Sequence, residues 1–185
     1  MPQTCPALAN YLAGDDCLEN IAGLGEVAYI GLRSELKKAL TATDNTYSLS
    51  ATDFIDGAKR LVKVELKEES QKIAGESQGK RKGFNLTGTL VFDAVNSEVA
   101  KLARALNNLD LFVIMPDGDE AQILYDPNKK IRIESGGLTS DTGAAAGDDR
   151  VTTVNLTLGP VKYPSLFVTV PEGGFDTLVG PAPTE

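Results

Sequence analysis

The chain contains no histidine, and this absence removes a large class of reactions. Ser-His-Asp and Cys-His sites use an imidazole to take the proton from the nucleophile, so both arrangements are excluded. Two S-x-x-K sequences remain, from Ser34 to Lys37 and from Ser77 to Lys80. The hydrolases that use this motif also need S-D-N and K-T-G partners, which the chain lacks. We therefore expect no catalytic residue and no enzymatic activity.

Ligands for metals and cofactors are also sparse. Cys5 and Cys17 are too few soft ligands for a zinc site without histidine, and free thiols are favoured over a single disulfide because no export signal precedes them. The sequence GLGEVA, with Gly23, Gly25 and Ala28, fits G-x-G-x-x-A. The dinucleotide fingerprint requires a strand before this motif and a helix opening at it, whereas EVAYIGL after it is typical of a strand. We expect no metal and no cofactor.

Carboxylates gather in the stretch SGGLTSDTGAAAGDD at residues 135–149, which holds Asp141, Asp148 and Asp149. These acids would repel a phosphate, and their spacing differs from that of a calcium-binding EF-hand loop. A loop that becomes ordered on assembly is the better interpretation. The short stretch PDGDE at residues 116–120 is interpreted as a solvated turn for the same reason.

The charge of the chain is uneven. The net charge is −8, yet residues 58–92 hold eight bases against four acids. An acidic body repels nucleic acid, while a local basic segment can meet an acidic surface, including that of a second copy. The basic run Lys80, Arg81 and Lys82 has no interleaved aromatic residue, so it is a weak candidate for binding single-stranded nucleic acid.

The size and composition of the chain are those of one globular domain. Its 185 residues are 42% hydrophobic and 24% charged, and no apolar run approaches the ~20 residues that span a bilayer. The first residues lack a positive segment followed by an apolar core, so we expect no secretory signal and a cytoplasmic location.

Hydrophobic periodicity predicts a mainly β fold. Alternation of apolar and polar residues is strongest in RLVKVELKE and GFNLTGTLVF, which are expected to pair as a hairpin. Gly88 in the second of these indicates a bulge or a close approach of another segment. Further strands are predicted at residues 26–32, 111–115, 121–125, 130–134, 150–158 and 166–170. The three from 111 to 134 are expected to form a meander, and the last is expected at a sheet edge because prolines surround it.

Two helical patterns accompany these strands. Residues 97–108 have Val99, Leu102, Ala103 and Leu106 on one face, and Asn96 or Ser97 can cap the first turn. A short helix is also expected in SELKKAL, residues 34–40. The fold predicted is an antiparallel β-sandwich or partly closed barrel of about seven strands with the helix at 97–108 on its side. It occupies residues 26–158, between an irregular N-terminal arm at 1–25 and a Pro/Gly-rich extension at 159–185.

The segment between the two expected hairpin strands is unusually long. Residues 68–83 are almost entirely polar, although a tight hairpin needs only two to five residues there. We interpret this segment as a projecting hairpin loop. It is either an arm that becomes ordered against a neighbouring copy or a disordered surface loop without a partner.

The order of these parts resembles that of the tail-tube (major tail) proteins of tailed bacteriophages and prophages, particularly those of gut Bacteroidetes. The resemblance covers about residues 16–158, from DCLENIAGLGEVAYIG through KVELKEE, GFNLTGTLVF, SEVAKLARALNN, DLFVIMPDG and GGLTSDTGAAAGD to VTTVNLTL. It implies a virion structural protein that folds in the bacterial cytoplasm, forms rings that are commonly hexameric, and stacks them into a tube. DNA would pass through this tube, and other tail proteins would bind its ends.

The resemblance turns the charged segments into candidate assembly contacts. Rings and stacks both need unlike surfaces of neighbouring copies to meet. The candidates are Lys72, Lys80, Arg81 and Lys82 on the basic side and Asp141, Asp148 and Asp149 on the acidic side. Acids are also expected to line the bore, where they would repel the DNA backbone. The alternatives are a tail-terminator or neck protein, and a separate β-sandwich adhesin or carbohydrate-binding module, which the absence of tryptophan disfavours.

Overall fold

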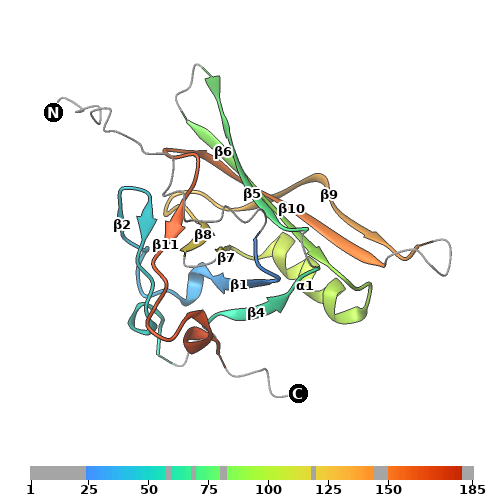
Figure 1. Ribbon diagram of the computed structural model, residues 1–185, viewed down its shortest axis with the longest axis horizontal. Helices are drawn as coiled ribbons and strands as arrows, with labels where there is room; N and C mark the ends of the chain where they lie inside the picture. Colours follow the sequence, from blue (N-terminus) through green and yellow to red (C-terminus); the bar gives the residue numbers. More distant parts are fainter. Residues whose placement is uncertain are drawn as a thin grey trace, which may run out of the picture.

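A computed structural model describes residues 24–56, 60–67, 70–79, 83–117, 120–143 and 150–180. These residues form two sheets and one α-helix (Figure 1). The β-sandwich with a single flanking helix is thereby confirmed, and the sheets do not close into a barrel.

The first sheet has seven strands, in the order β2-β3-β11-β8-β7-β1-β4. All of its neighbours are antiparallel except β3 and β11. Its strands are β1 (Val27–Leu32), β2 (Ala42–Thr43), β3 (Thr46–Tyr47), β4 (Val62–Glu65), β7 (Leu111–Asp117), β8 (Glu120–Leu124) and β11 (Phe167–Val168).

The second sheet has four longer strands, in the order β5-β6-β10-β9. They are β5 (Lys72–Ser77), β6 (Phe84–Phe92), β9 (Arg132–Asp141) and β10 (Val151–Val161). The β5–β6 hairpin rises at the top of Figure 1, and the β9–β10 hairpin extends to the right, so both reach past the first sheet.

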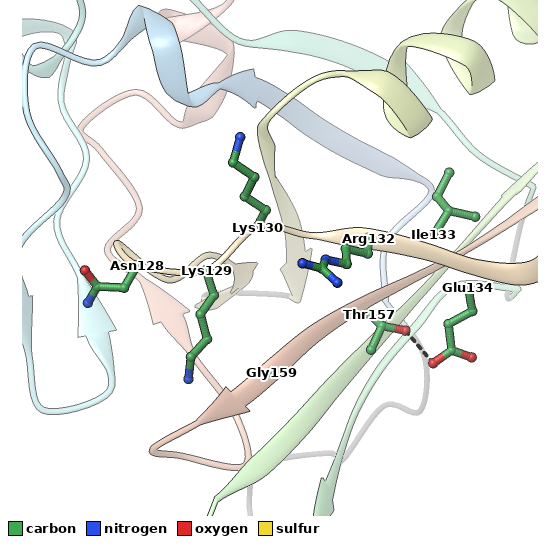
Figure 2. Close-up of a pocket in the computed structure, with 8 residues that line it drawn as sticks. All are labelled: Asn128, Lys129, Lys130, Arg132, Ile133, Glu134, Thr157 and Gly159. Carbon is green, nitrogen blue, oxygen red and sulfur yellow. Dashed lines mark hydrogen bonds between the residues drawn. The ribbon is translucent and has the colours of Figure 1, made fainter.

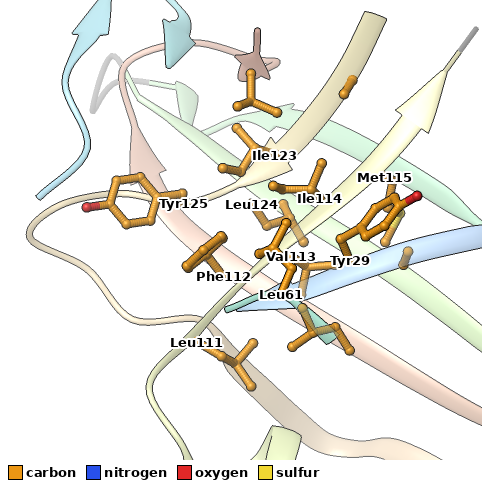
Figure 3. Packing of buried hydrophobic residues seen from close by; sticks show 14 of the residues in the cluster. Tyr29, Leu61, Leu111, Phe112, Val113, Ile114, Met115, Ile123, Leu124 and Tyr125 are labelled. Carbon is orange, nitrogen blue, oxygen red and sulfur yellow. The ribbon is translucent and has the colours of Figure 1, made fainter. Parts of the chain in front are cut away.

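The core lies on both faces of β7, whose residues Leu111 to Met115 are all at most 3% exposed (Figure 3). One face meets the second sheet. There Leu124 packs over Gly88 so closely that a Cβ at Gly88 would lie 2.4 Å from its Cδ1. A close approach at Gly88 is therefore present, but it is made by the Leu124 side chain rather than by another backbone segment. On the other face, the rings of Phe112 and Tyr125 meet edge to face with centroids 6.0 Å apart.

The helix α1 (Ser97–Asn108) begins where the sequence predicts. The side chain of Asn96 accepts a hydrogen bond of 2.8 Å from the backbone N–H of Val99, which satisfies one free donor of the first turn. Ala103 and Leu106 are buried, and α1 packs beside β9. The helical stripe read from the sequence is therefore the docked face.

The expected hairpin partner of β6 was wrong. The alternating segment RLVKVELKE forms β4, which pairs with β1 in the other sheet, and β5 takes its place beside β6. The segment at residues 68–83 is thus not a loop along its whole length, because Lys72–Ser77 is a strand. Its polar composition hid it, since only one face of this edge strand meets the core and Ile73 is its sole large apolar residue.

Three further local predictions were wrong. The meander ends after β8, because β9 crosses to the second sheet and pairs with β10. The same pairing draws residues 135–141 of the expected loop into β9, around a register shift opposite Val154 and Leu156. The expected helix in SELKKAL is only a 3-10 turn, Arg33–Glu35, because the backbone of Leu36 and Lys37 is held by Phe54 and Asp53 instead.

The C-terminal residues pack into the same body. β11 lies between β3 and β8, so this strand is inside the sheet and not at its edge as expected. Leu166, Phe175 and Leu178 are at most 5% exposed, the latter two in a 3-10 helix, η4 (Phe175–Leu178). Residues 1–23 of the expected N-terminal arm lie outside the described residues.

Candidate assembly surfaces

The β5–β6 hairpin carries the first candidate contact. Its last strand pair is Ser77 with Phe84, after which the N–H of Gln78 donates a 2.8 Å hydrogen bond to the carbonyl of Gly83. Lys72 lies exposed near the base of β5. Lys80, Arg81 and Lys82 belong to the tip and lie outside the described residues, as do Asp148 and Asp149 at the end of the β9–β10 hairpin.

Both edges of the second sheet are open. Within the described ranges, β5 pairs only with β6, and β9 pairs only with β10. Each edge therefore presents backbone N–H and C=O groups that can accept another strand. Lys72 lies on one edge strand and Asp141 ends the other, so the structure keeps these two predicted contacts on opposite sides of the sheet.

The outer face of this sheet is polar and mostly uncharged. Because Leu86 and Leu90 point into the core, the alternate residues of β6 and their partners in β10 point outward. The hydroxyl of Thr89 donates a 3.0 Å hydrogen bond to the Asn155 side chain across these strands. The outward residues of the two central strands are Asn85, Thr87, Thr89, Val91, Thr153, Asn155 and Thr157.

An open basic groove of about 610 Å³ lies where β9 leaves the turn after β8 (Figure 2). It is lined by Asn128, Lys129, Lys130, Arg132, Ile133, Glu134, Thr157 and Gly159. Figure 2 shows the side chains of Lys129 and Lys130 pointing in opposite directions. Lys130 pairs with Asp110 at 3.1 Å, whereas Lys129 and Arg132 form no ion pair within the described part of the chain.

Arg33 fixes the turn that forms this basic groove. Its guanidinium donates hydrogen bonds of 2.6 Å to the carbonyls of Lys129 and Pro127 and lies 5.4 Å from the ring centroid of Tyr125. The N–H of Asn128 donates to the Asp126 carboxylate at 2.9 Å, which closes the turn locally. The positions of the lysine backbones are thus held before any partner arrives.

An acidic tip ends the β7–β8 hairpin. We define it as Asp117 and Glu120, which are exposed and directly opposite each other in the strand register. Like charges opposed across two strands are destabilising. Neither carboxylate forms an ion pair with another described residue.

The S-x-x-K and GLGEVA motifs have ordinary structural roles where they lie in the described residues. Lys37 of the first S-x-x-K sequence pairs with Asp56 at 3.2 Å. Gly25 leads into β1 rather than into a helix, as the strand interpretation of GLGEVA required. No group of three metal-ligating side chains converges among the described residues.

No helix in the described ranges is long and apolar enough to cross a membrane. The chain matches no protein-family model, no curated protein and no solved structure. The surfaces described above therefore rest on this chain alone.

The basic groove was not predicted from the sequence. Lys130 and Arg132 were expected only as part of a strand at residues 130–134 and Lys129 as part of the turn before it, although three bases within four positions were a visible signal. The groove depends on Arg33 and Asp110 as well, and only the fold brings these residues beside the turn.

Proposed function

We propose that this chain is a structural subunit of a bacteriophage or prophage tail, which assembles through unlike surfaces into stacked rings that form the tail tube. The observation that carries the proposal is the second sheet, whose two edge strands are both open and lie on opposite sides. The resemblance in element order supports it.

Edge strands of this kind favour a heterologous contact. The β9 edge of one copy can meet the β5 edge of the next, and this contact uses a different surface on each partner. Such contacts close into a ring when the rotation between copies divides a full turn, and otherwise continue as a filament. A sheet that stays open in the monomer becomes continuous in the ring.

The projecting β5–β6 hairpin supplies a second contact. It extends past the first sheet (Figure 1), and its tip sequence holds Lys80, Arg81 and Lys82. On an acidic chain, such a tip is complementary to acids on a neighbouring copy, for which Asp141, Asp148 and Asp149 are the candidates. On this proposal the subunit folds in the bacterial cytoplasm and resides in the virion. Other tail proteins cap the tube, and DNA passes through it without specific binding.

A carbohydrate-binding or adhesin module is the alternative. Such modules present exposed aromatic rings for stacking on sugars. In the described ranges, every tyrosine and phenylalanine side chain is buried or half-buried. This observation favours the assembly protein over the binding module.

Electron microscopy of the purified protein, concentrated in steps, tests the proposal. We expect rings or tubes, with tubes of indefinite length distinguishing a tube subunit from a terminator or neck protein that stops at one ring. A glycan array is the matched control. Glycan binding by a protein that stays monomeric at every concentration would overturn the proposal.

A further inference from the structure

Strand β8 carries opposite charges at its two ends. The acidic tip, Asp117 and Glu120, lies where β8 begins, and the basic groove follows directly after β8 ends at Leu124. The four residue steps from Glu120 to Leu124 span about 13 Å at the usual rise per residue. The two surfaces therefore lie at opposite ends of β8.

The acidic tip is electrostatically unsatisfied in the single subunit. Asp117 and Glu120 oppose each other across the hairpin, and no cation of the described residues pairs with either. A pair of cations brought by a partner would remove this repulsion.

The basic groove is built to receive carboxylates. Lys130 and Arg33 are occupied by Asp110, so Lys129 and Arg132 are the cations left for a partner. Arg33 holds the turn through the carbonyls of Lys129 and Pro127, and Glu134, which also lines the groove, accepts a 3.0 Å hydrogen bond from the Thr157 hydroxyl. A planar guanidinium such as that of Arg132 can bind a carboxylate through two parallel hydrogen bonds.

We propose that the acidic tip of one copy docks in the basic groove of the next copy, head to tail along β8. The inference rests on the proposed function for its partner, a second copy of this chain, and it adds the contact that stacks one ring on another. Because tip and groove lie at opposite ends, each docked copy leaves a free tip and a free groove. The contact therefore repeats in one direction and cannot be completed within a symmetric pair.

Charge complementarity favours a second copy of this chain, whose net charge is −8, as the partner that binds in the basic groove. At one end of β8 the basic groove holds two cations, Lys129 and Arg132, with no ion pair among the described residues, and at the other end the acidic tip holds two carboxylates. A free phosphate would satisfy the groove but would leave the repulsion between Asp117 and Glu120 in place. Docking of a second copy satisfies both surfaces at once.

Charge reversal tests the contact. The groove variant is Lys129→Glu with Arg132→Glu, the tip variant is Asp117→Lys with Glu120→Lys, and the swap variant carries all four changes. Lys101→Glu with Arg104→Glu, on the exposed side of α1, is the matched control. We expect the groove and tip variants to need at least about tenfold more protein to assemble. The control should assemble like the wild type.

Two complementary results are expected from the reversed chains. An equimolar mixture of groove and tip variants should assemble, because each tip then meets a groove of opposite charge. The swap variant should assemble alone. Circular dichroism and thermal unfolding of each variant will test whether it is folded. A folded groove variant that assembles at the same protein concentration as the wild type would overturn the inference.

Carbodiimide crosslinking separates this inference from the proposed function. In mixtures of isotope-labelled and unlabelled wild-type chains, we expect crosslinks from Asp117 or Glu120 of one chain to Lys129 of another. Crosslinks of this kind without rings or tubes would support the contact and count against the tail-tube function. Tubes that lack these crosslinks and tolerate charge reversal, or a groove that binds only inorganic phosphate, would overturn the contact and leave the function standing.

Discussion

The hydroxyl of Tyr29 donates a 2.9 Å hydrogen bond to the carboxylate of Asp176, which lies 147 residues further along the chain. The ammonium of Lys63 lies 2.9 Å from the same carboxylate. These contacts join the C-terminal 3-10 helix η4 to β1 and β4, and the rings of Tyr29 and Phe175 pack beside them with centroids 5.4 Å apart. These contacts therefore hold η4 against β1 and β4 of the first sheet.

The Asp176 contact predicts a pH-dependent stability. Hydrogen bonds from Lys63 and then Tyr29 lower the pKa of Asp176 below its ordinary value of 3.8. A lowered folded-state pKa stabilises the fold above the unfolded-state pKa of about 3.9, and this contribution is lost as the pH falls through the folded-state pKa. We expect Asp176→Asn to lower the melting temperature at pH 7 and the difference from wild type to shrink by pH 3. An equal difference at both values would contradict this account.

The C-terminal residues should be necessary for folding. Leu178 is 2% exposed and belongs to the common core, so Leu178→Ala should cost about 2–5 kcal/mol of unfolding free energy in urea titrations. Ending the chain after Leu158 removes β11 and η4 and should prevent folding altogether. Thr177→Ala, at an exposed neighbouring position, is the control and should have a much smaller effect. A truncated chain that unfolds cooperatively would show that residues 159–180 are dispensable.

The glycines at close approaches should not tolerate a methyl group. A Cβ at Gly75 would lie 2.0 Å from the carbonyl oxygen of Pro164, and a backbone atom cannot turn aside as a side chain can. Gly75→Ala should therefore destabilise the protein by about 1–3 kcal/mol. Gly25→Ala is the control, because its nearest contact, at 3.6 Å, is ordinary. Equal melting temperatures for the two variants would show that the segment at Pro164 yields freely.

Proline in β5 should separate folding from ring formation. Successive N–H groups of an antiparallel edge strand point alternately to the neighbouring strand and outward. Of the variants Ile73→Pro and Ala74→Pro, one therefore removes a backbone hydrogen bond to β6. The other removes only a backbone N–H that points away from β6. We expect one variant to remain folded by circular dichroism and yet form no rings in electron micrographs. Rings from both folded variants would exclude the β5 edge as a contact.

The hairpin tip can be tested by its charge alone. Deleting residues 70–81 would remove the whole of β5 and uncover β6, so such a deletion would not test the tip separately. Replacing Lys80, Arg81 and Lys82 by serine keeps the strand. We expect a folded monomer whose assembly is weakened and depends less on salt, measured by sedimentation at 50 and 500 mM salt, roughly bracketing physiological screening. Unchanged assembly at both concentrations would assign the tip no role.

The sequence predicted the elements better than their partners. The period-two pattern located β6 and β10, and the stripe from Val99 to Leu106 located α1, because each pattern reports one buried face directly. Pairing depends on contacts between distant segments, which no local pattern reports. The predicted β4–β6 hairpin failed for that reason, and β5 was missed because an edge strand needs few apolar residues.

The same limit applies to the candidate surfaces. Lys72 and Asp141 were named from charge, and they lie on opposite edge strands of one sheet. The basic groove was not predicted because the turn that forms it is held by Arg33. This residue lies almost a hundred residues before Pro127 and Lys129, whose carbonyls it binds. Five of the seven predicted contacts lie outside the described residues, and their role stays a prediction.

The position of β11 bears on the order of events during synthesis. Phe167 and Val168 join β3 to β8, so the first sheet stays divided until these two residues have been synthesised. A nascent chain therefore cannot complete the first sheet before β11 has been synthesised. Contacts between residues so distant in sequence are expected to slow folding. Until Phe167 and Val168 have emerged, the facing edges of β3 and β8 stay unpaired and open to other strands.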